Sequence, residues 1–315
     1  MILNLMPTSV VNKTYMDKLR ESTGAEILDV ENLADHVDIL DQVEAIIPHW
    51  RLKEEDLALC KNLKWIQSYT AGVNTYPLNY MKENGITLTN TSGVHAPAMT
   101  DHIMGMMLAF SRALMPCIRN QKDKVWNTDY PLYELDGKEL LIVGAGHIGS
   151  LLAKKAKAFD MKVIGLKRTV VPLENFDEVR GLGELKESMK TPDYVVILAP
   201  LTEKTRGMIG FEELYAMKKD AVLINLARGP LIVEEALLEV LKEKKIRGAG
   251  LDVFHKEPLK EDNPLWDLDN IILTPHLGGF SDQIVRRAME FISGNIIRFE
   301  KGEKLENIVN LELGY

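Results

Sequence analysis

The chain alternates short apolar runs with longer polar stretches of helical periodicity. Up to Thr91 the apolar runs predict strands, and the polar stretches between them predict helices. The predicted strands are Ile2–Leu5, Glu26–Val30, Ala45–Pro48, Trp65–Ser68 and Ile86–Thr89. Because strands and helices alternate, we expect a parallel sheet with helices on both faces.

The same alternation resumes after a helical stretch at Ala96–Asn120 and a polar, aromatic segment at Lys122–Leu135, which predicts a loop or a dimer contact. It predicts six more strands, as in a doubly wound Rossmann domain. These strands are Leu140–Val143, Lys162–Leu166, Tyr194–Ala199, Ala221–Leu226, Ala249–Phe254 and Ile271–Thr274.

We therefore predict an α/β protein with two domains. Residues 1–95 with 296–315 form a smaller, flavodoxin-like α/β substrate domain, and residues 96–295 form a doubly wound, parallel-sheet dinucleotide-binding domain that includes the linking helices. The length of 315 residues suits two domains.

Composition narrows the function classes. The net charge of −8 argues against nucleic acid or an anionic membrane surface as a partner. Only Cys60 and Cys117 are present, far apart, so we expect neither a disulfide framework nor a metal site, and we expect a cytoplasmic protein. No apolar run is long enough to span a bilayer.

A glycine loop between a predicted strand and a predicted helix is the first chemical motif. Val143 is followed by Gly144, Gly146 and Gly149 in the G-x-G-x-x-G spacing of dinucleotide-binding proteins. We expect Gly144 to allow the tight turn, Gly146 to let the backbone approach a pyrophosphate, and Gly149 to let the helix pack closely. The N–H groups near His147 and Ile148 would then meet the anion.

Three residues that can act on a carbonyl substrate follow successive strands of the second domain. Arg228, Glu257 and His276 each come after a predicted strand, and Asp252 lies at the end of the middle one. Each alone also has a structural interpretation: a turn cap, a solvated acid, a hydrogen-bonded histidine. Ligands bind at the carboxyl ends of such strands, so their joint placement beside the glycine loop favours function.

These residue types suit the reduction of a 2-keto acid. Hydride transfer from a nicotinamide to a carbonyl carbon leaves negative charge on the carbonyl oxygen. A guanidinium can polarise that oxygen and clamp a neighbouring carboxylate. An imidazolium can donate the proton, and a carboxylate beside it holds its orientation and favours its protonated form.

The sequence resembles the D-isomer-specific 2-hydroxyacid dehydrogenases over nearly its whole length. Four ordered motifs carry the resemblance: Val143–Gly149, Asn225–Pro230, Gly250–Pro258 and Thr274–Gly279. The resemblance implies that Arg228 clamps the substrate, that His276 is the acid/base and that Glu257 is its partner. It also implies a homodimer.

Further residues are assigned through the same resemblance. It implies that the backbone amides of Ala71, Gly72 and Val73 hold the substrate carboxylate. It implies a cofactor site whose other members are Asp252 at the nicotinamide carboxamide, Thr100 near the nicotinamide, Pro200 and Thr205 lining the cofactor, and Ala227 and Gly278 within the motifs.

The cofactor preference is read from the end of the second strand of the domain. NAD-binding proteins place an acidic residue roughly 20 residues past the glycines, where it binds the ribose 2′-hydroxyl. Here Lys167 occupies that place, followed by Arg168 and Thr169. Two cations and a hydroxyl suit a 2′-phosphate, so NADP(H) is favoured. A solvated basic turn is the alternative interpretation, and NAD(H) remains open.

The substrate side chain is poorly specified. Trp50 lies beside a strand end and could line the pocket, although a core aromatic is the alternative. Phe280 replaces the small residue usual in the family and would narrow the pocket, which favours glyoxylate, hydroxypyruvate and short 2-keto acids. The competing functions are an NAD-dependent, phosphoglycerate-type dehydrogenase and a non-enzymatic nucleotide sensor that binds a partner protein.

Overall fold

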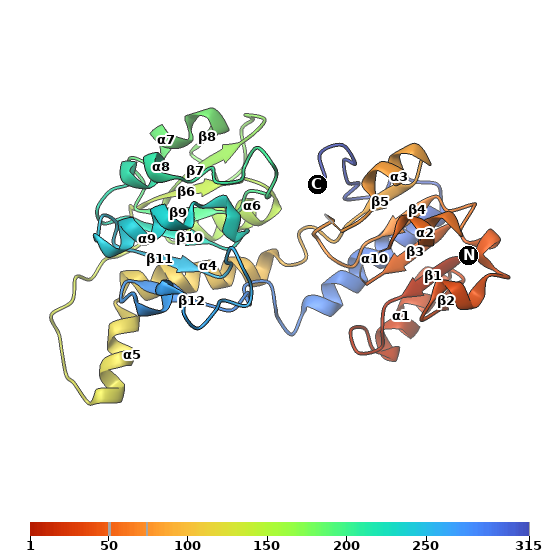
Figure 1. Cartoon of the computed structure of the whole chain (residues 1–315), viewed down its shortest axis with the longest axis horizontal. Coiled ribbons are helices and arrows are strands. Elements are labelled where there is room, and N and C mark those ends of the chain that lie inside the picture. The colour runs from red at the N-terminus through yellow and green to blue at the C-terminus, as the bar shows by residue number, and fades with distance from the viewer. Residues whose placement is uncertain (50–51, 74, 315) are drawn as a thin grey trace. The chain divides into compact units, whose positions relative to one another are not determined.

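The computed structural model describes residues 1–49, 52–73 and 75–314, which form two compact units. The first unit contains Met1–Val94 and Ser281–Tyr315, and the second contains His95–Phe280. Figure 1 shows a parallel sheet with helices against it in each unit.

Strands of the first unit form a five-stranded parallel sheet in the order β2-β1-β3-β4-β5, counted over the described residues. This is the flavodoxin-like order, as predicted. The bounds are β1 Ile2–Leu5, β2 Ile27–Asp29, β3 Ala45–Pro48, β4 Trp65–Gln67 and β5 Thr87–Thr89.

Helices cover this sheet and include one from the end of the chain. The α-helices are α1 Lys13–Thr23, α2 Glu54–Ala58, α3 Leu78–Glu83 and α10 Ile284–Glu300, and the short 3₁₀ turns are η1 Leu33–His36 and η2 Leu40–Gln42. In the last segment the tail returns to the sheet, where the Val309 N–H donates to the Leu88 carbonyl over 2.9 Å.

The place of α10 differs from the predicted boundary at residue 296. The whole helix belongs to the first unit, because Met289, Ile292 and Ile296 are buried in the same core as Ile2 and Trp65. The apolar face of α10 therefore packs against the sheet of the first unit. Residues 281–295 lie outside the second unit, contrary to the predicted boundary.

Strands of the second unit form a seven-stranded parallel sheet in the order β12-β11-β10-β9-β6-β7-β8 among the described residues. The order reverses between β6 and β9, which is the switch point at which doubly wound sheets bind ligands. The strands are β6 Glu139–Val143, β7 Lys162–Lys167, β8 Glu178–Gly181, β9 Tyr194–Ile197, β10 Val222–Asn225, β11 Gly248–Leu251 and β12 Ile271–Leu273. The predicted Rossmann class is confirmed.

Helices of the second unit lie on both faces of this sheet (Figure 1). They are α4 Ala96–Ser111, α5 Leu114–Asp123, α6 His147–Lys157, α7 Leu185–Ser188, α8 Phe211–Ala216 and α9 Glu234–Lys242, with 3₁₀ turns η3 Leu182–Glu184, η4 Gly229–Leu231 and η5 Pro264–Asp267. The single helix predicted at Ala96–Asn120 is two helices, because Ala113 takes a left-handed conformation with φ of 51°.

The two apolar cores of the second unit lie on opposite faces of the sheet. Residues of β6 illustrate the division, since Leu141 and Val143 enter one core and Leu140 and Ile142 the other. Successive side chains of a strand point to opposite faces. A sheet buried on both faces explains why most of its strands read as continuous apolar runs.

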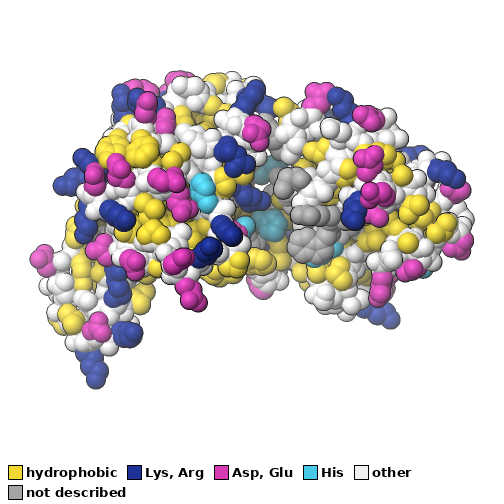
Figure 2. All heavy atoms as spheres, in the orientation of Figure 1, with side chains coloured by type: hydrophobic (Ala, Val, Ile, Leu, Met, Phe, Trp, Pro, Cys, Tyr) yellow, Lys and Arg dark blue, Asp and Glu magenta, His cyan; other side chains and the backbone are white. Residues whose placement is uncertain are grey.

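Figure 2 shows positive and negative side chains interspersed over the visible face of the protein.

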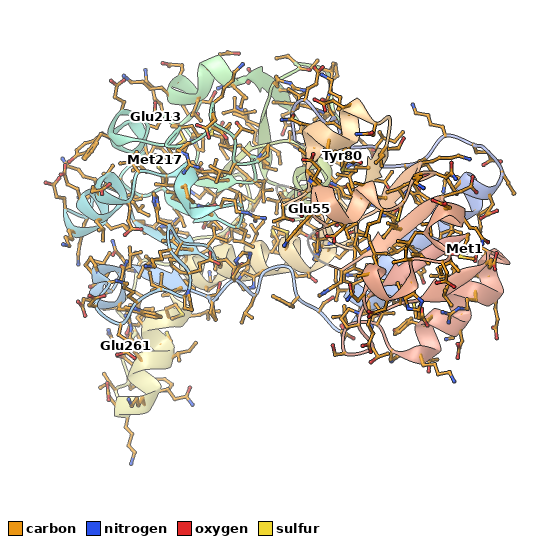
Figure 3. The ribbon with its side chains drawn as sticks, turned by 45° about the vertical axis from the view of Figure 1, so that its right-hand side comes forward. Met1, Glu55, Tyr80, Glu213, Met217 and Glu261 are labelled. Carbon is orange, nitrogen blue, oxygen red and sulfur yellow. The ribbon has the colours of Figure 1, made fainter. Side chains whose placement is uncertain are left out.

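The start of α8 is held by a side chain of its own first turn. Figure 3 labels this residue, Glu213, whose carboxylate accepts a hydrogen bond from the Gly210 N–H over 3.0 Å. Across residues 1–49, 52–73 and 75–314, no helix combines the length and the apolar character needed to cross a membrane.

Candidate active site

The glycine loop between β6 and α6 has the steric features expected of it. Gly144 has φ of +109°, and a Cβ there would lie 2.5 Å from the backbone nitrogen of Ala199. A Cβ on Gly149 would lie 2.8 Å from the Gly144 carbonyl oxygen. Only glycine therefore fits the turn at Gly144 and the close helix contact at Gly149.

Gly146 differs from the other two glycines. A Cβ on Gly146 would meet nothing within 4 Å, so this glycine is not required by the protein's own packing. It caps α6, whose first N–H groups at His147 and Ile148 have no partner inside the helix. An open space before a helix N-terminus at the switch point fits a pyrophosphate group.

Neighbouring strand ends supply the other predicted cofactor residues. Lys167 ends β7, and Arg168 and Thr169 follow it as exposed residues. After β9, the Thr205 hydroxyl donates to the Pro200 carbonyl over 2.7 Å and accepts the Thr202 N–H over 2.8 Å. Thr205 thus shapes the loop beside the glycine turn.

Arg228 lies on a loop that is fixed by its neighbours. The side chain of Asn225, fully buried at the end of β10, accepts the Ala227 N–H and donates to the Arg228 carbonyl, each over 3.0 Å. A Cβ on Gly229 would lie 2.0 Å from the carbonyl carbon of Phe254. The loop after β10 therefore packs directly on the loop after β11, with the Arg228 side chain exposed.

Asp252 organises the turn that carries His276. Asp252 is 2% exposed, and its carboxylate accepts a hydrogen bond from the Thr274 hydroxyl over 2.6 Å. It also accepts the N–H groups of Leu277 over 2.8 Å and Gly278 over 2.9 Å. Gly278 leaves the space for this approach, since its Cβ would lie 2.8 Å from Asp252 Oδ2.

His276 and Glu257 form a direct pair. The imidazole Nδ1 lies 2.7 Å from Glu257 Oε2, and the other carboxylate oxygen accepts the Phe254 N–H over 3.0 Å. His276 has φ of 55°, a left-handed conformation that costs a non-glycine residue about 1–2 kcal/mol. The Asp252 carbonyl holds this backbone by accepting the His276 N–H over 2.9 Å.

The charge of Glu257 determines which imidazole nitrogen is available. Burial opposes ionisation, but hydrogen bonds from His276 and the Phe254 N–H, with the nearby charges of His276 and Arg228, hold the pKa of Glu257 below its usual range. An ionised carboxylate only accepts hydrogen bonds, so Nδ1 carries the proton. Among the residues that the structure describes, no hydrogen bond occupies Nε2, which leaves this nitrogen for a ligand on a side chain that is 48% exposed.

The structure therefore brings Arg228, Glu257 and His276 together in one unit. It places Ala71, Gly72 and Val73 in the first unit, in a loop after β4 held by a bond from the Asn90 amide to the Ala71 carbonyl over 2.9 Å. Within the described ranges, the hydrogen bonds present leave the N–H groups of these three residues available.

Trp50 and Thr100 are two further residues of the predicted site. Trp50 lies outside the described residues. Thr100 is fully buried in α4, and its hydroxyl donates to the carbonyls of Ala96 over 2.7 Å and Pro97 over 3.0 Å. That hydroxyl is engaged with its own helix.

Several positioning residues were not found by the sequence reasoning. Asn225 holds the loop of Arg228, and Thr274 joins Asp252 to His102, whose Nε2 lies 3.0 Å from the Thr274 hydroxyl. Both Asn225 and Thr274 are polar residues at the ends of apolar strands, and that interruption was the available signal. In the described part of the chain, no group of three His, Cys, Asp or Glu side chains could hold a metal ion.

Comparison with known proteins shows the family of this chain. Residues 104–278 match the family model described as the NAD binding domain of D-isomer specific 2-hydroxyacid dehydrogenases. Glyoxylate reductase from Pyrococcus furiosus is 31% identical over 319 residues, which cover 97% of this chain and 95% of the relative.

Two more relatives broaden the comparison. D-3-phosphoglycerate dehydrogenase from Methanocaldococcus jannaschii is 38% identical over 254 residues, covering 80% of this chain and only 48% of that longer protein. A solved NADPH-dependent glyoxylate/hydroxypyruvate reductase from Sinorhizobium meliloti, in complex with NADP and sulfate, superposes with a TM-score of 0.83 at 27% identity, covering 100% of this chain and 99% of that one.

The model match covers more than half of the chain, and the glyoxylate reductase match covers nearly all of it. The chain therefore belongs to the D-isomer specific 2-hydroxyacid dehydrogenases, and it is an NAD(P)-dependent oxidoreductase.

Proposed function

We propose that this protein reduces a small 2-keto acid to the D-2-hydroxy acid with NADPH. The observation that carries the proposal is the 2.7 Å contact between His276 Nδ1 and Glu257 Oε2, with Arg228 on the adjoining loop. The relatives named glyoxylate reductase and NADPH-dependent glyoxylate/hydroxypyruvate reductase support this class of substrate.

The cofactor would be held along the switch point. The N–H groups at His147 and Ile148, beside the open position at Gly146, would bind the pyrophosphate. Lys167, Arg168 and Thr169 would bind a 2′-phosphate, since cations and a hydroxyl suit a phosphate better than a ribose hydroxyl. When bound, a reduced nicotinamide supplies the hydride. Remaining members of the proposed cofactor site are Thr100, Gly144, Gly149, Pro200, Thr205, Ala227, Asp252 and Gly278.

Side chains and backbone amides of the protein would polarise the substrate carbonyl oxygen and supply the proton that it takes up. Arg228 would clamp the substrate carboxylate and polarise the adjacent carbonyl. For the first unit we propose, from the family resemblance alone, that the backbone amides of Ala71, Gly72 and Val73 bind the substrate carboxylate. His276 would donate its Nε2 proton to the carbonyl oxygen as charge develops there. Glu257 would hold the orientation of the ring by accepting a hydrogen bond from Nδ1.

Oxidation of NADPH and NADH, compared side by side with glyoxylate, hydroxypyruvate, pyruvate and branched 2-keto acids, tests this proposal. We expect turnover with NADPH well above that with NADH for the smaller acids. Preference for NADH would refute the role of Lys167 and Arg168. Absence of turnover with either cofactor, despite tight binding, would favour a nucleotide-sensing role.

A variant separates the cofactor assignment from the substrate assignment. Lys167→Asp places a carboxylate where NAD-binding proteins carry one. We expect it to weaken NADPH binding and improve NADH binding, while the order of preference among keto acids stays the same. Lys154→Asp, on an exposed position of α6, is a matched charge control that should change neither.

A second candidate substrate is 3-phosphoglycerate with NAD. The 38% identity to D-3-phosphoglycerate dehydrogenase favours it, although this chain spans about half the length of that relative. Reduction of phosphohydroxypyruvate in the same assay would reveal it. From the two isolated cysteines and the family resemblance, we further propose a cytoplasmic homodimer.

A further inference from the structure

Helix α4 contacts the turn that carries His276 at both ends of that turn. The Nε2 atom of His102, on α4, lies 3.0 Å from the hydroxyl of Thr274, where the turn begins. The Nδ1 atom of His95, the residue just before α4, lies 3.1 Å from the carbonyl oxygen of Gly279, where the turn ends. His95 and His102 are about two helical turns apart, so both rings leave the same side of the helix.

The partners of the two histidines determine where their protons lie. The Thr274 hydroxyl has a single proton, which it donates to Asp252 Oδ1 over 2.6 Å. Its oxygen therefore accepts a hydrogen bond from His102, whose Nε2 carries a proton. The Gly279 carbonyl can only accept, so Nδ1 of His95 carries a proton as well. Both histidines thus donate hydrogen bonds to the turn.

Asp252 extends the contact of His102 to the backbone beside His276. The buried carboxylate of Asp252 accepts the N–H groups of Leu277 and Gly278, the two residues that follow His276. A chain of hydrogen bonds therefore runs from His102 through the Thr274 hydroxyl and Asp252 to these two amides. Each bond in such a chain polarises the next, so the orientation of the Thr274 hydroxyl affects the whole series.

The backbone of His276 needs support of this kind. Its φ of 55° is a conformation that persists in non-glycine residues only where the surroundings fix it from several sides. The side chains of Leu277 and Phe280 are 50% and 72% exposed, so packing contributes little to holding this turn. Hydrogen bonds from neighbouring elements therefore have to hold it.

Helix α4 is itself firmly placed within the second unit. Its residues Ile103 and Met107 are fully buried in an apolar core of that unit. The Lys155 ammonium, on α6, donates to the Pro97 carbonyl over 3.3 Å and pairs with the Asp101 carboxylate. Helix α4 is therefore bonded to the helix that follows the glycine loop and also to the turn of His276.

We propose that His102 and His95 are positioning residues, which hold the turn of His276 against α4 in the conformation needed for proton transfer. His102 acts through Thr274 and Asp252, and His95 acts on the carbonyl of Gly279. The consequence for turnover rests on the proposed function, in which His276 is the proton donor. The support of the turn by the two histidines does not depend on any reaction.

Amide hydrogen exchange of the full chain, without cofactor or substrate, tests this support directly. His102→Leu removes the donor, whereas His102→Gln keeps an N–H at the corresponding distance along the side chain. We expect the amides of Leu277 and Gly278 to exchange about tenfold faster or more in His102→Leu, and within about threefold of the unmodified rate in His102→Gln. Exchange in β6 and β9 should be the same in all three proteins.

Further variants locate the path of the effect. Thr274→Val should accelerate exchange of the same two amides and Thr274→Ser should not, because serine keeps the hydroxyl. The double variant His102→Leu with Thr274→Val should exchange no faster than Thr274→Val alone, since both changes break one chain of hydrogen bonds. His95→Leu should accelerate the Phe280 amide, which follows Gly279. His36→Leu, the same change in the turn η1 of the first unit, is the matched control and should alter none of these rates.

Kinetics of the same variants measure the consequence for the reaction. Displacement of a reacting group by about 1 Å costs about 100-fold, so kcat of His102→Leu should fall about tenfold or more while KM changes less than about threefold. His102→Gln should restore kcat.

Three exchange results would overturn the support proposed for His102. These are an unchanged rate at Leu277 and Gly278 in His102→Leu, equally fast exchange in His102→Leu and His102→Gln, and acceleration that extends to β6 and β9, which would mean a general loss of stability. An unmodified protein without turnover that still shows the expected exchange rates would support the role of the two histidines and count against the proposed reaction.

Discussion

At the scale of single residues, His276 as the proposed proton donor gives the most direct test. His276→Ala removes the imidazole but leaves the glycine turn and the strand ends in place. General acid catalysis is worth about 10²–10⁴-fold, so kcat should fall by that factor while the affinity for NADPH stays within about twofold. Steady-state kinetics and fluorescence titration of NADPH measure the two quantities.

His255→Ala provides the matched control for this variant. His255 lies near Glu257 in sequence, but its Nε2 bonds to the Ile232 carbonyl over 2.7 Å and not to the acid. Its removal should leave kcat within a few-fold. Turnover like that of the unmodified protein in His276→Ala would contradict the assigned role of the imidazole.

Glu257 leads to a prediction about pH and stability. A carboxyl group whose pKa is lowered on folding stabilises the folded state above its unfolded pKa, about 4.3, and that contribution disappears as the pH falls through the folded pKa. The pair is partly exposed, so its contribution is about 1 kcal/mol or less. Glu257→Gln should therefore lower Tm at pH 7 by about 1–4 °C.

Melting curves of both proteins between pH 7 and pH 3 measure this effect. The difference in Tm should shrink on acidification and vanish once Glu257 is protonated in the folded protein. A difference that stays constant over this range would show that the glutamate stabilises the fold by packing and not by its charge.

At the scale of elements, the turn from β6 to α6 contains two glycines, Gly144 and Gly146, for which we expect different effects of substitution. Gly144→Ala forces a Cβ against the Ala199 backbone at positive φ, which costs about 3 kcal/mol or more and lowers Tm by roughly 6–12 °C. Gly146→Ala meets no protein atom, so its Tm should change by less than about 2 °C. Its NADPH affinity should fall at least about tenfold, because the added methyl would occupy the space that we propose for the pyrophosphate.

Differential scanning fluorimetry and NADPH titration distinguish the two outcomes. A Gly146→Ala protein that binds NADPH normally would argue against a pyrophosphate at this turn. A Gly144→Ala protein of unchanged stability would mean that the loop between β6 and α6 can shift away from Ala199.

Elements also show where sequence reasoning succeeds. The buried strands were predictable because a sheet covered on both faces requires continuous apolar runs, as in Leu140–Val143. Strand β8 was missed because it lies at the sheet edge, where Glu178 and Arg180 interrupt the apolar pattern. The break between α4 and α5 was missed because Ala113 gives no local signal for a left-handed conformation.

The candidate site was partly predictable for a related reason. Arg228, Glu257 and His276 follow strands that share one sheet, so their convergence follows from topology. The support from Asn225 and Asp252 depends on loop hydrogen bonds between segments far apart in sequence. No local pattern encodes those contacts.

At the scale of the whole molecule, the two units differ in continuity. The second unit is one segment, His95–Phe280, with its own cores. The first unit needs both chain ends, because α10 packs against its sheet through Met289, Ile292 and Ile296 and the Phe299 ring lies 4.9 Å from that of Trp65. The units should therefore respond differently to truncation.

Two truncated chains test this difference. Residues 95–280 alone should fold and bind NADPH within about tenfold of the full chain, a change of about 1.4 kcal/mol, since every proposed cofactor residue lies in this segment. Residues 1–280 should keep the second unit and lose the first, because removal of α10 exposes Ile2 and Trp65.

Amide hydrogen exchange on both truncated chains reads out each unit separately. In residues 1–280 we expect rapid exchange in β1, β3 and β4, and protection in β6, β9 and β10 equal to that in the full chain. Protection of β1 and β4 without α10 would show that the N-terminal segment has a sufficient core of its own. An unfolded 95–280 chain would show that the second unit depends on the first for stability, and NADPH binding would then have to be measured in the full chain alone.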